Sequence, residues 1–332
     1  MLTTILGIDI AKDTLAIELR RANSTPEQAE FKNILTDFKK LQRFLQHRAA
    51  SPAHVCMEAT GRYWERLAEF LVEQGHTVSV VNPARIKKYA ESQLRRNKTD
   101  RLDASVIADF CATQSPLPWV SPTPVERELQ TLVRHLADLE ADRQRQRNRR
   151  HALSHAAHSS PTVEANLRQQ VAFLDTQIQH TKQAIQDFID HHPDLKRQRD
   201  LLDSIIGIGP LTAAKLLGEL GDISRFDDVR QLVAFVGLNP RHHQSGSSVR
   251  GETTISKVGR ASIRATLYMP AVVAKRFDPR LAAWADTLET RGLCQMQIIV
   301  AVMRKLLHYS FGVLKSGQPY DPYWGLSLTA QT

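Results

Sequence analysis

The stretch Leu-Thr-Thr-Ile-Leu-Gly-Ile-Asp-Ile, residues 2–10, predicts a buried β-strand that carries one carboxylate, Asp9, between two isoleucines. A lone carboxylate in apolar surroundings is costly unless it is paired or binds a metal ion. Asp9 is therefore expected either to face solvent from a half-exposed strand or to belong to a functional site.

The residues that follow predict a mixed sheet with covering helices. Further strands are expected at residues 14–19, 29–34, 53–58 and 76–81, and helices at 36–48, at 63–74 and from about residues 85 and 99. Three strands, a helix and then alternating strands and helices describe an α/β domain like that of ribonuclease-H-like nucleases. A Pro-rich stretch at residues 115–124 ends this domain, because proline interrupts helices.

The rest of the chain is predicted to be mainly helical. Two long polar helices broken at residues 159–161 predict an antiparallel helical hairpin, a dimerising coiled coil, or ordinary helices packed on a domain. The expected division is an α/β domain at residues 1–115, a helical linker at 125–198, a mainly α domain at 199–316 and a loosely structured tail at 317–332.

The charge balance favours a polyanionic partner. The 44 Lys and Arg exceed the 35 Asp and Glu and give a formal net charge of +9. No apolar run is long enough to predict a membrane span, and no signal peptide is visible. Three widely spaced cysteines predict buried thiols in a reducing compartment, so we expect a cytoplasmic, nucleoid-associated protein without membrane partners.

Three further carboxylates could join Asp9. Glu58 ends a predicted strand, and Asp100 and Asp103 share one face of a helix's first turn, after the predicted cap Thr99. An ordinary strand-end glutamate, and acidic residues that stabilise a helix N-terminus, are the plain alternatives. Together, however, the four oxygen donors suit one or two divalent ions such as Mg²⁺ or Mn²⁺, which can steady both oxygens of a reacting phosphodiester.

The C-terminal part offers a second set of candidates. Gly207 and Gly209, in a segment with a helix-hairpin-helix pattern, permit a tight turn whose following helix N-terminus could hold a phosphate. Ser245 lies in a loop with basic residues that could bind nucleic acid. These are Arg241, Arg250, Lys257, Arg260 and Arg264. Composition alone equally allows a flexible loop without chemistry.

Four motifs give the chain a family resemblance. Residues 7–12 (Gly-Ile-Asp-Ile-Ala-Lys), 57–61 (Met-Glu-Ala-Thr-Gly), 81–83 (Val-Asn-Pro) and 98–104 (Lys-Thr-Asp-Arg-Leu-Asp-Ala) resemble the signatures of DEDD insertion-sequence transposases of family one-ten, relatives of the Piv invertases. The resemblance implies a RuvC-like N-terminal domain whose metal-binding tetrad is Asp9, Glu58, Asp100 and Asp103.

The region at residues 235–268 is similar to the C-terminal domain of the same family, with its nucleophilic serine. The similarity implies that Ser245 is this serine, with Ser247 and Ser248 as neighbours that alignment error could promote instead. His242 and His243 could act as a base or only touch a nucleic-acid backbone.

The resemblance implies a site-specific recombinase that cuts and rejoins DNA through a phosphoserine, guided by a non-coding bridge RNA. Four strand cuts imply a dimer or a tetramer. The alternatives are a metal-dependent Holliday-junction resolvase, an invertase without an RNA guide, and a non-enzymatic nucleic-acid-binding protein. The order Asp, Glu, Asp-x-x-Asp disfavours the last alternative, and the serine loop disfavours the first.

Overall fold

The computed structural model describes residues 4–93, 100–241, 244–245, 249–250 and 254–323. The chain divides into two compact units, residues 1–121 and 122–332, each with its own hydrophobic core. The border between them falls within the Pro-rich stretch.

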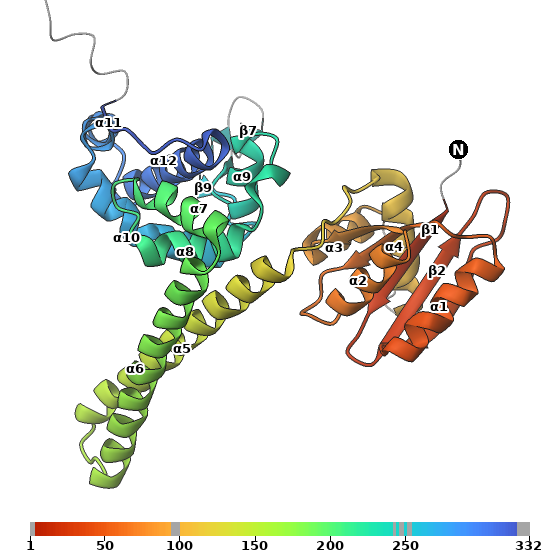
Figure 1. Cartoon of the computed structure of the whole chain (residues 1–332), viewed down its shortest axis with the longest axis horizontal. Helices are drawn as coiled ribbons and strands as arrows, with labels where there is room; N and C mark the ends of the chain where they lie inside the picture. Colours follow the sequence, from red (N-terminus) through yellow and green to blue (C-terminus); the bar gives the residue numbers. More distant parts are fainter. Residues whose placement is uncertain (1–3, 94–99, 242–243, 246–248, 251–253, 324–332) are drawn as a thin grey trace, which may run out of the picture. The chain divides into compact units, whose positions relative to one another are not determined.

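A five-stranded mixed sheet forms the centre of the first unit (Figure 1). The strands are β1 (Ile5–Ile10), β2 (Thr14–Arg20), β3 (Glu27–Lys32), β4 (His54–Glu58) and β5 (Thr77–Val81), in the order β3-β2-β1-β4-β5. The first three strands pair antiparallel, whereas β4 and β5 run parallel to β1. The predicted mixed sheet is thus confirmed.

Each face of the sheet packs against its own helices. Alternate side chains of a strand point to opposite faces. Leu6 and Ile8 therefore pack with α1 (Leu35–His47) and α2 (Glu65–Glu73). On the other face, Ile5 packs with α3 (Pro83–Ser92) and α4 (Asp100–Gln114). Gly7 and Asp9 share this second face with Ile5.

The predicted long helices form an antiparallel hairpin within the second unit (Figure 1). α5 (Pro124–Ser154) starts with a capping box, in which the Thr123 hydroxyl accepts from the Glu126 amide and the Glu126 carboxylate accepts from the Thr123 amide. α6 (Pro161–Asp190) returns along it, with an ion pair of 2.9 Å between Arg143 and Asp175.

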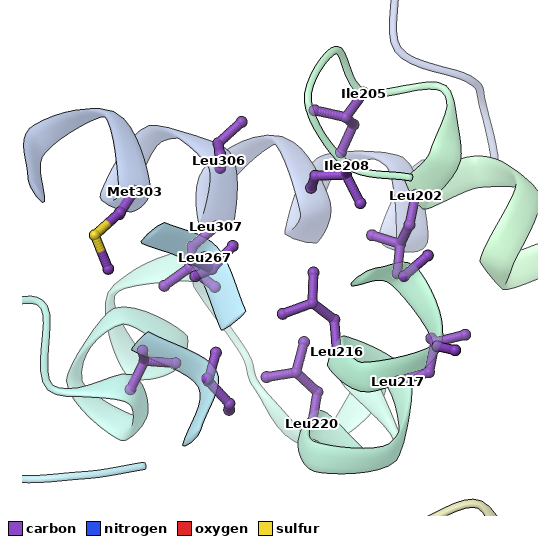
Figure 2. Close-up of a cluster of buried hydrophobic side chains, with 14 of the residues drawn as sticks. Leu202, Ile205, Ile208, Leu216, Leu217, Leu220, Leu267, Met303, Leu306 and Leu307 are labelled. Carbon is purple, nitrogen blue, oxygen red and sulfur yellow. The ribbon is translucent and has the colours of Figure 1, made fainter. Parts of the chain in front are cut away.

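The remaining helices surround one apolar core. They are α7 (Pro193–Asp203), α8 (Pro210–Leu220), α9 (Val229–Val236), α10 (Ala261–Phe277), α11 (Pro279–Thr290) and α12 (Gln295–Ser316). Figure 2 shows leucines of α8 and α12 gathered with Ile205 and Ile208 from the turn before α8. The mainly helical character predicted for this region is confirmed.

In the part of the chain that the structure describes, α12 alone is long and apolar enough to pass for a membrane span. Its Val302, Leu306 and Leu307 are buried in the core of the second unit, which is how a core helix of a folded domain behaves.

The first residues of the predicted loose tail are anchored. The Tyr320 amide donates to the Ser204 hydroxyl at 2.8 Å, and the Tyr320 hydroxyl donates to the Asp278 carboxylate at 2.8 Å. Asp278 is fully buried and also caps α11. From Gly317 to Tyr323 the chain forms no helix or strand, and Tyr320 holds this segment against the core.

Candidate active site

Asp9 and Glu58 lie side by side at one end of the sheet. β1 and β4 are parallel neighbours, and Ile8 is paired with Met57, so Asp9 and Glu58 follow at the same level. Both side chains are half-buried and belong to the face that α4 covers. The Thr60 hydroxyl donates to Glu58 Oε1 at 3.0 Å and so orients this carboxylate.

α4 brings Asp103 to the same end. A Cβ placed on Gly7 would lie 2.5 Å from the Ala104 carbonyl oxygen and 2.4 Å from the Ala108 amide nitrogen, so the helix crosses β1 there. Later in α4, the Cys111 thiol lies 3.9 Å from the carbonyl oxygen of His54, which is paired with Ile5 at the start of β1. The helix therefore runs opposite to β1, and its first turn, which contains half-buried Asp103, lies towards the end where Asp9 stands.

Three of the predicted tetrad thus lie at one end of one face of the sheet. The backbone of Asp100 starts α4, while the predicted cap Thr99 lies outside the described residues. Among the side chains that the structure describes, no group of three or more His, Cys, Asp or Glu is close enough to hold a metal ion. Metal binding by the tetrad stays a prediction.

Ser245 lies on a small β-ribbon. β7 (Gln244–Ser245) pairs antiparallel with β8 (Val249–Arg250), and β6 (Pro240–Arg241) pairs with β9 (Thr254–Ile255) below it. The other predicted serines and the two histidines lie outside the described residues; they are Ser247, Ser248, His242 and His243. Where the sequence predicted a loop, the described residues thus form two short antiparallel ladders, and we call the ladder of β6 and β9 the stem.

Two glycines close the stem of the ribbon. Gly237 and Gly259 have φ of 79° and 144°, conformations that favour glycine. A Cβ on Gly259 would lie 2.3 Å from the Phe235 carbonyl oxygen. The Lys257 and Arg260 amides donate to the carbonyls of Gly237 and Phe235 across this contact. Backbone hydrogen bonds thus hold the base of the stem against the end of α9.

The predicted basic residues near the stem differ in their surroundings. The Arg264 guanidinium donates to the Val236 carbonyl at 2.7 Å and thereby supports the stem. Lys257 and Arg260 are both exposed, and Arg260 also lies over the Phe235 ring. These two side chains are hence more accessible to a nucleic-acid phosphate than Arg264.

Sequence reasoning missed Glu219 on α8. This carboxylate is 7% exposed and lies 3.7 Å from the Arg134 guanidinium of α5 and 3.6 Å from that of Arg260, which caps α10. It links the helical hairpin to the end of the serine stem. A charged residue between the buried leucines of α8 was the available signal.

Gly207 and Gly209 occupy the turn between α7 and α8. Gly207 has φ of 97°, and a Cβ there would lie 2.5 Å from the Pro270 carbonyl oxygen of α10. Gly209 caps α8, and a Cβ on it would meet open space. Gly207 thus serves the packing of α10, while phosphate binding at the α8 N-terminus stays a prediction.

Comparison with known proteins agrees with this arrangement. Residues 6–156 match a family model described as "Transposase", and residues 199–285 match "Transposase IS116/IS110/IS902 family". The chain is 35% identical to the pilin gene-inverting protein of Moraxella bovis over 325 residues, which cover 97% of this chain and 98% of the relative. It is 27% identical to the transposase for insertion sequence element IS1111A of Coxiella burnetii, over 90% of this chain and 86% of the relative.

The two segments that match the family models include the sheet carboxylates and Ser245. The chain therefore belongs to the IS110-type family of insertion-sequence transposases and DNA invertases, and it is a DNA recombinase.

Proposed function

We propose that this recombinase cuts and rejoins DNA through a phosphoserine at Ser245, with divalent metal held by Asp9, Glu58, Asp100 and Asp103. The observation that carries the proposal is the common placement of Asp9, Glu58 and the first turn of α4 at one end of the sheet. The strand order with three antiparallel strands first agrees with a RuvC-like, ribonuclease-H-like domain.

The residues present fit a hard divalent ion. Every member of the tetrad offers carboxylate oxygens, which Mg²⁺ and Mn²⁺ prefer. Thr60 already orients Glu58, as an outer partner of a metal ligand would. Bound metal would stabilise charge on the phosphodiester oxygens. The carboxylates would hold this metal at the neighbouring ends of β1 and β4.

In the proposed step, Ser245 Oγ attacks a DNA phosphorus and loses its proton. The bond from phosphorus to one deoxyribose oxygen breaks, and that oxygen takes up a proton to become a free hydroxyl. A phosphodiester between Ser245 and DNA replaces the DNA phosphodiester, so the number of phosphodiester bonds does not change. A second hydroxyl can then rejoin the strand without an external energy source. Exposed Lys257 and the basic residues of the ribbon, Arg241 and Arg250, would balance charge on the phosphate.

A non-coding RNA that pairs with target and donor DNA is proposed as the guide, following the family resemblance. Base pairing would then select the sequence, while the excess of basic residues binds phosphate backbones irrespective of sequence. Four strand cuts require several protomers, so the active form is proposed to be a dimer or tetramer. The helix-hairpin-helix-like turn at Gly207 and Gly209 would clamp one backbone.

The experiment is to trap protein on element-end DNA with guide RNA and Mn²⁺. A covalent adduct is expected for the wild type, and it should be lost with Ser245→Ala but kept with Ser247→Ala and Ser248→Ala. Asp9→Asn should remove metal-dependent thermal stabilisation, since a ligand that binds the folded state raises its stability. An adduct that survives Ser245→Ala would overturn the assignment of the nucleophile.

The similarity to pilin gene-inverting proteins favours one alternative, an invertase that needs no RNA. The same trapping reaction without RNA separates the two, because an invertase would form the adduct on duplex DNA alone. A metal-dependent junction resolvase would instead cut branched DNA and leave no protein attached.

A further inference from the structure

We infer that Arg20 on β2 is the positioning residue that holds α4 in place and thereby sets Asp103, in the first turn of this helix, opposite Asp9 and Glu58. The inference rests on the proposed function, because it assigns to Arg20 the geometry of the proposed metal site.

The Arg20 guanidinium bonds in three directions. Nη1 donates to Asp109 Oδ1 at 2.7 Å, and Nη2 donates to the Ser105 carbonyl at 3.1 Å, so both of these bonds reach α4. Nε donates to Glu18 Oε1 at 2.8 Å, on the same strand as Arg20. The planar, forked guanidinium can satisfy this set, whereas a lysine ammonium cannot reach all three positions.

The partners of Arg20 are themselves fixed. Glu18 is 3% exposed, and its second oxygen accepts from the side-chain amide Nε2 of Gln28 on β3 at 2.9 Å. The second oxygen of Asp109 accepts from the Tyr89 hydroxyl of α3 at 2.7 Å. Burial disfavours the charge of Arg20, but its hydrogen bonds to the carboxylates of Asp109 and Glu18 outweigh burial and raise its pKa. The charged clamp thus connects α4 to β2, β3 and α3.

Apolar packing of α4, which includes buried Ile107 and Phe110, holds the helix on the sheet but is not directional, so it restrains rotation less than the Arg20 hydrogen bonds do. Where the helix crosses β1, the facing residues are Gly7, Ala104 and Ala108. Such small groups let backbones approach closely, but they have few atoms that resist sliding or rotation of the helix. A turn of a rigid helix about its axis would move Asp103, which is only two residues before Ser105.

Arg20 acts at a distance from the site. It is paired with Ile5, whereas Asp9 is paired with Ala16, four residues along β2. At the strand rise this separation is about 13 Å. Arg20 therefore cannot touch a metal ion at the carboxylates, and it is not a catalytic residue.

The test compares Arg20→Gln with Arg21→Gln by Mn²⁺ titration calorimetry on the full chain. Arg21 is the matched control because its partners lie outside α4: it donates to the Arg48 carbonyl at 2.9 Å and pairs with Glu27. Arg20→Gln should weaken Mn²⁺ binding about tenfold or more, as loss of an outer support does. Arg20→Lys should restore little of it, and Arg21→Gln should bind within about twofold of the wild type.

Hydrogen exchange of the α4 amides tests the role of Arg20 separately from the proposed metal site. Equal Mn²⁺ binding by the wild type and Asp9→Asn would refute the metal site. Faster exchange across α4 in Arg20→Gln, but not in Arg21→Gln, would still support the role of Arg20 in holding α4. If Arg20→Gln does not fold, Asp109→Asn removes one charge of the clamp and keeps a neutral acceptor for Nη1. Wild-type affinity together with wild-type exchange in a folded variant overturns the inference.

Discussion

Gly7 of β1 lies so near Ala104 of α4 that a Cβ on the glycine would come within 2.5 Å of the Ala104 carbonyl oxygen. The atoms that would meet the new methyl group are backbone, which cannot rotate away. The closeness of the helix to the strand is also what brings the first turn of α4 within reach of Asp9.

Gly7→Ala should consequently lower the free energy of unfolding by about 1–3 kcal/mol, as overpacking does, and weaken Mn²⁺ binding in parallel. Urea denaturation and titration calorimetry measure the two effects. Ala104→Gly should not rescue Gly7→Ala, because the clash involves the Ala104 backbone. Rescue by Ala104→Gly would show that side chains rather than backbone set the spacing.

Gly259 makes a separate prediction for the serine ribbon. Its φ of 144° and the 2.3 Å approach to the Phe235 carbonyl leave no room for a side chain. Gly259→Ala should cost about 1–3 kcal/mol and reduce formation of the serine adduct, since the stem must open. Gly312→Ala on α12 is the control, because a Cβ there meets open space and alanine favours a helix. Equal effects of both substitutions on the adduct would contradict the proposed role of the stem.

Glu219 should matter more than a surface carboxylate. Glu219→Gln leaves Arg134 and Arg260 without their shared negative partner and should lower the free energy of unfolding by about 1–2 kcal/mol, because solvent screens part of the interaction. Glu164→Gln, which removes an exposed pair with Arg168 on one helix, should change it by less than about 0.5 kcal/mol. Urea denaturation measures both free energies of unfolding. Equal values for Glu219→Gln and Glu164→Gln would show that Glu219 does not stabilise the stem.

Buried His76 should make the free energy of unfolding depend on pH. Its Nδ1 accepts from the Ala53 amide at 3.0 Å, and burial lowers its pKa below the ordinary value of 6.5. The unfolded chain therefore takes up a proton that the folded chain resists. The stability that this neutral ring contributes is fully present above about pH 6.5 and decreases as the pH falls below it.

His76→Gln should make stability less dependent on pH between about pH 7.5 and 5.5, measured by urea denaturation at each pH. His308 on α12, whose pKa is also lowered by burial, contributes with the same sign, so some dependence should remain. His47→Gln, at the exposed end of α1, is the control and should keep the wild-type slope. A His76→Gln slope equal to that of the wild type would refute this assignment.

The sequence located most elements because apolar periodicity reports local burial. β2 was expected at residues 14–19 and is observed at Thr14–Arg20, and α1 was expected at 36–48 and is observed at Leu35–His47. The third strand was expected at 29–34 but lies at Glu27–Lys32. β3 is an edge strand with half-exposed residues, so its apolar signal is weak and pairing with β2 decides its limits.

The sequence by itself determined the two kinds of domain and the candidates Asp9, Glu58, Asp103 and Ser245, because residue type and spacing are local properties. Only the tertiary structure decided that the first three share one face and one end of the sheet. It also paired Arg20 with Asp109, which lies 89 residues away, and Glu219 with Arg134 and Arg260. Charges so distant along the chain meet only after burial of the apolar cores has placed their helices and strands, and no local pattern records that outcome.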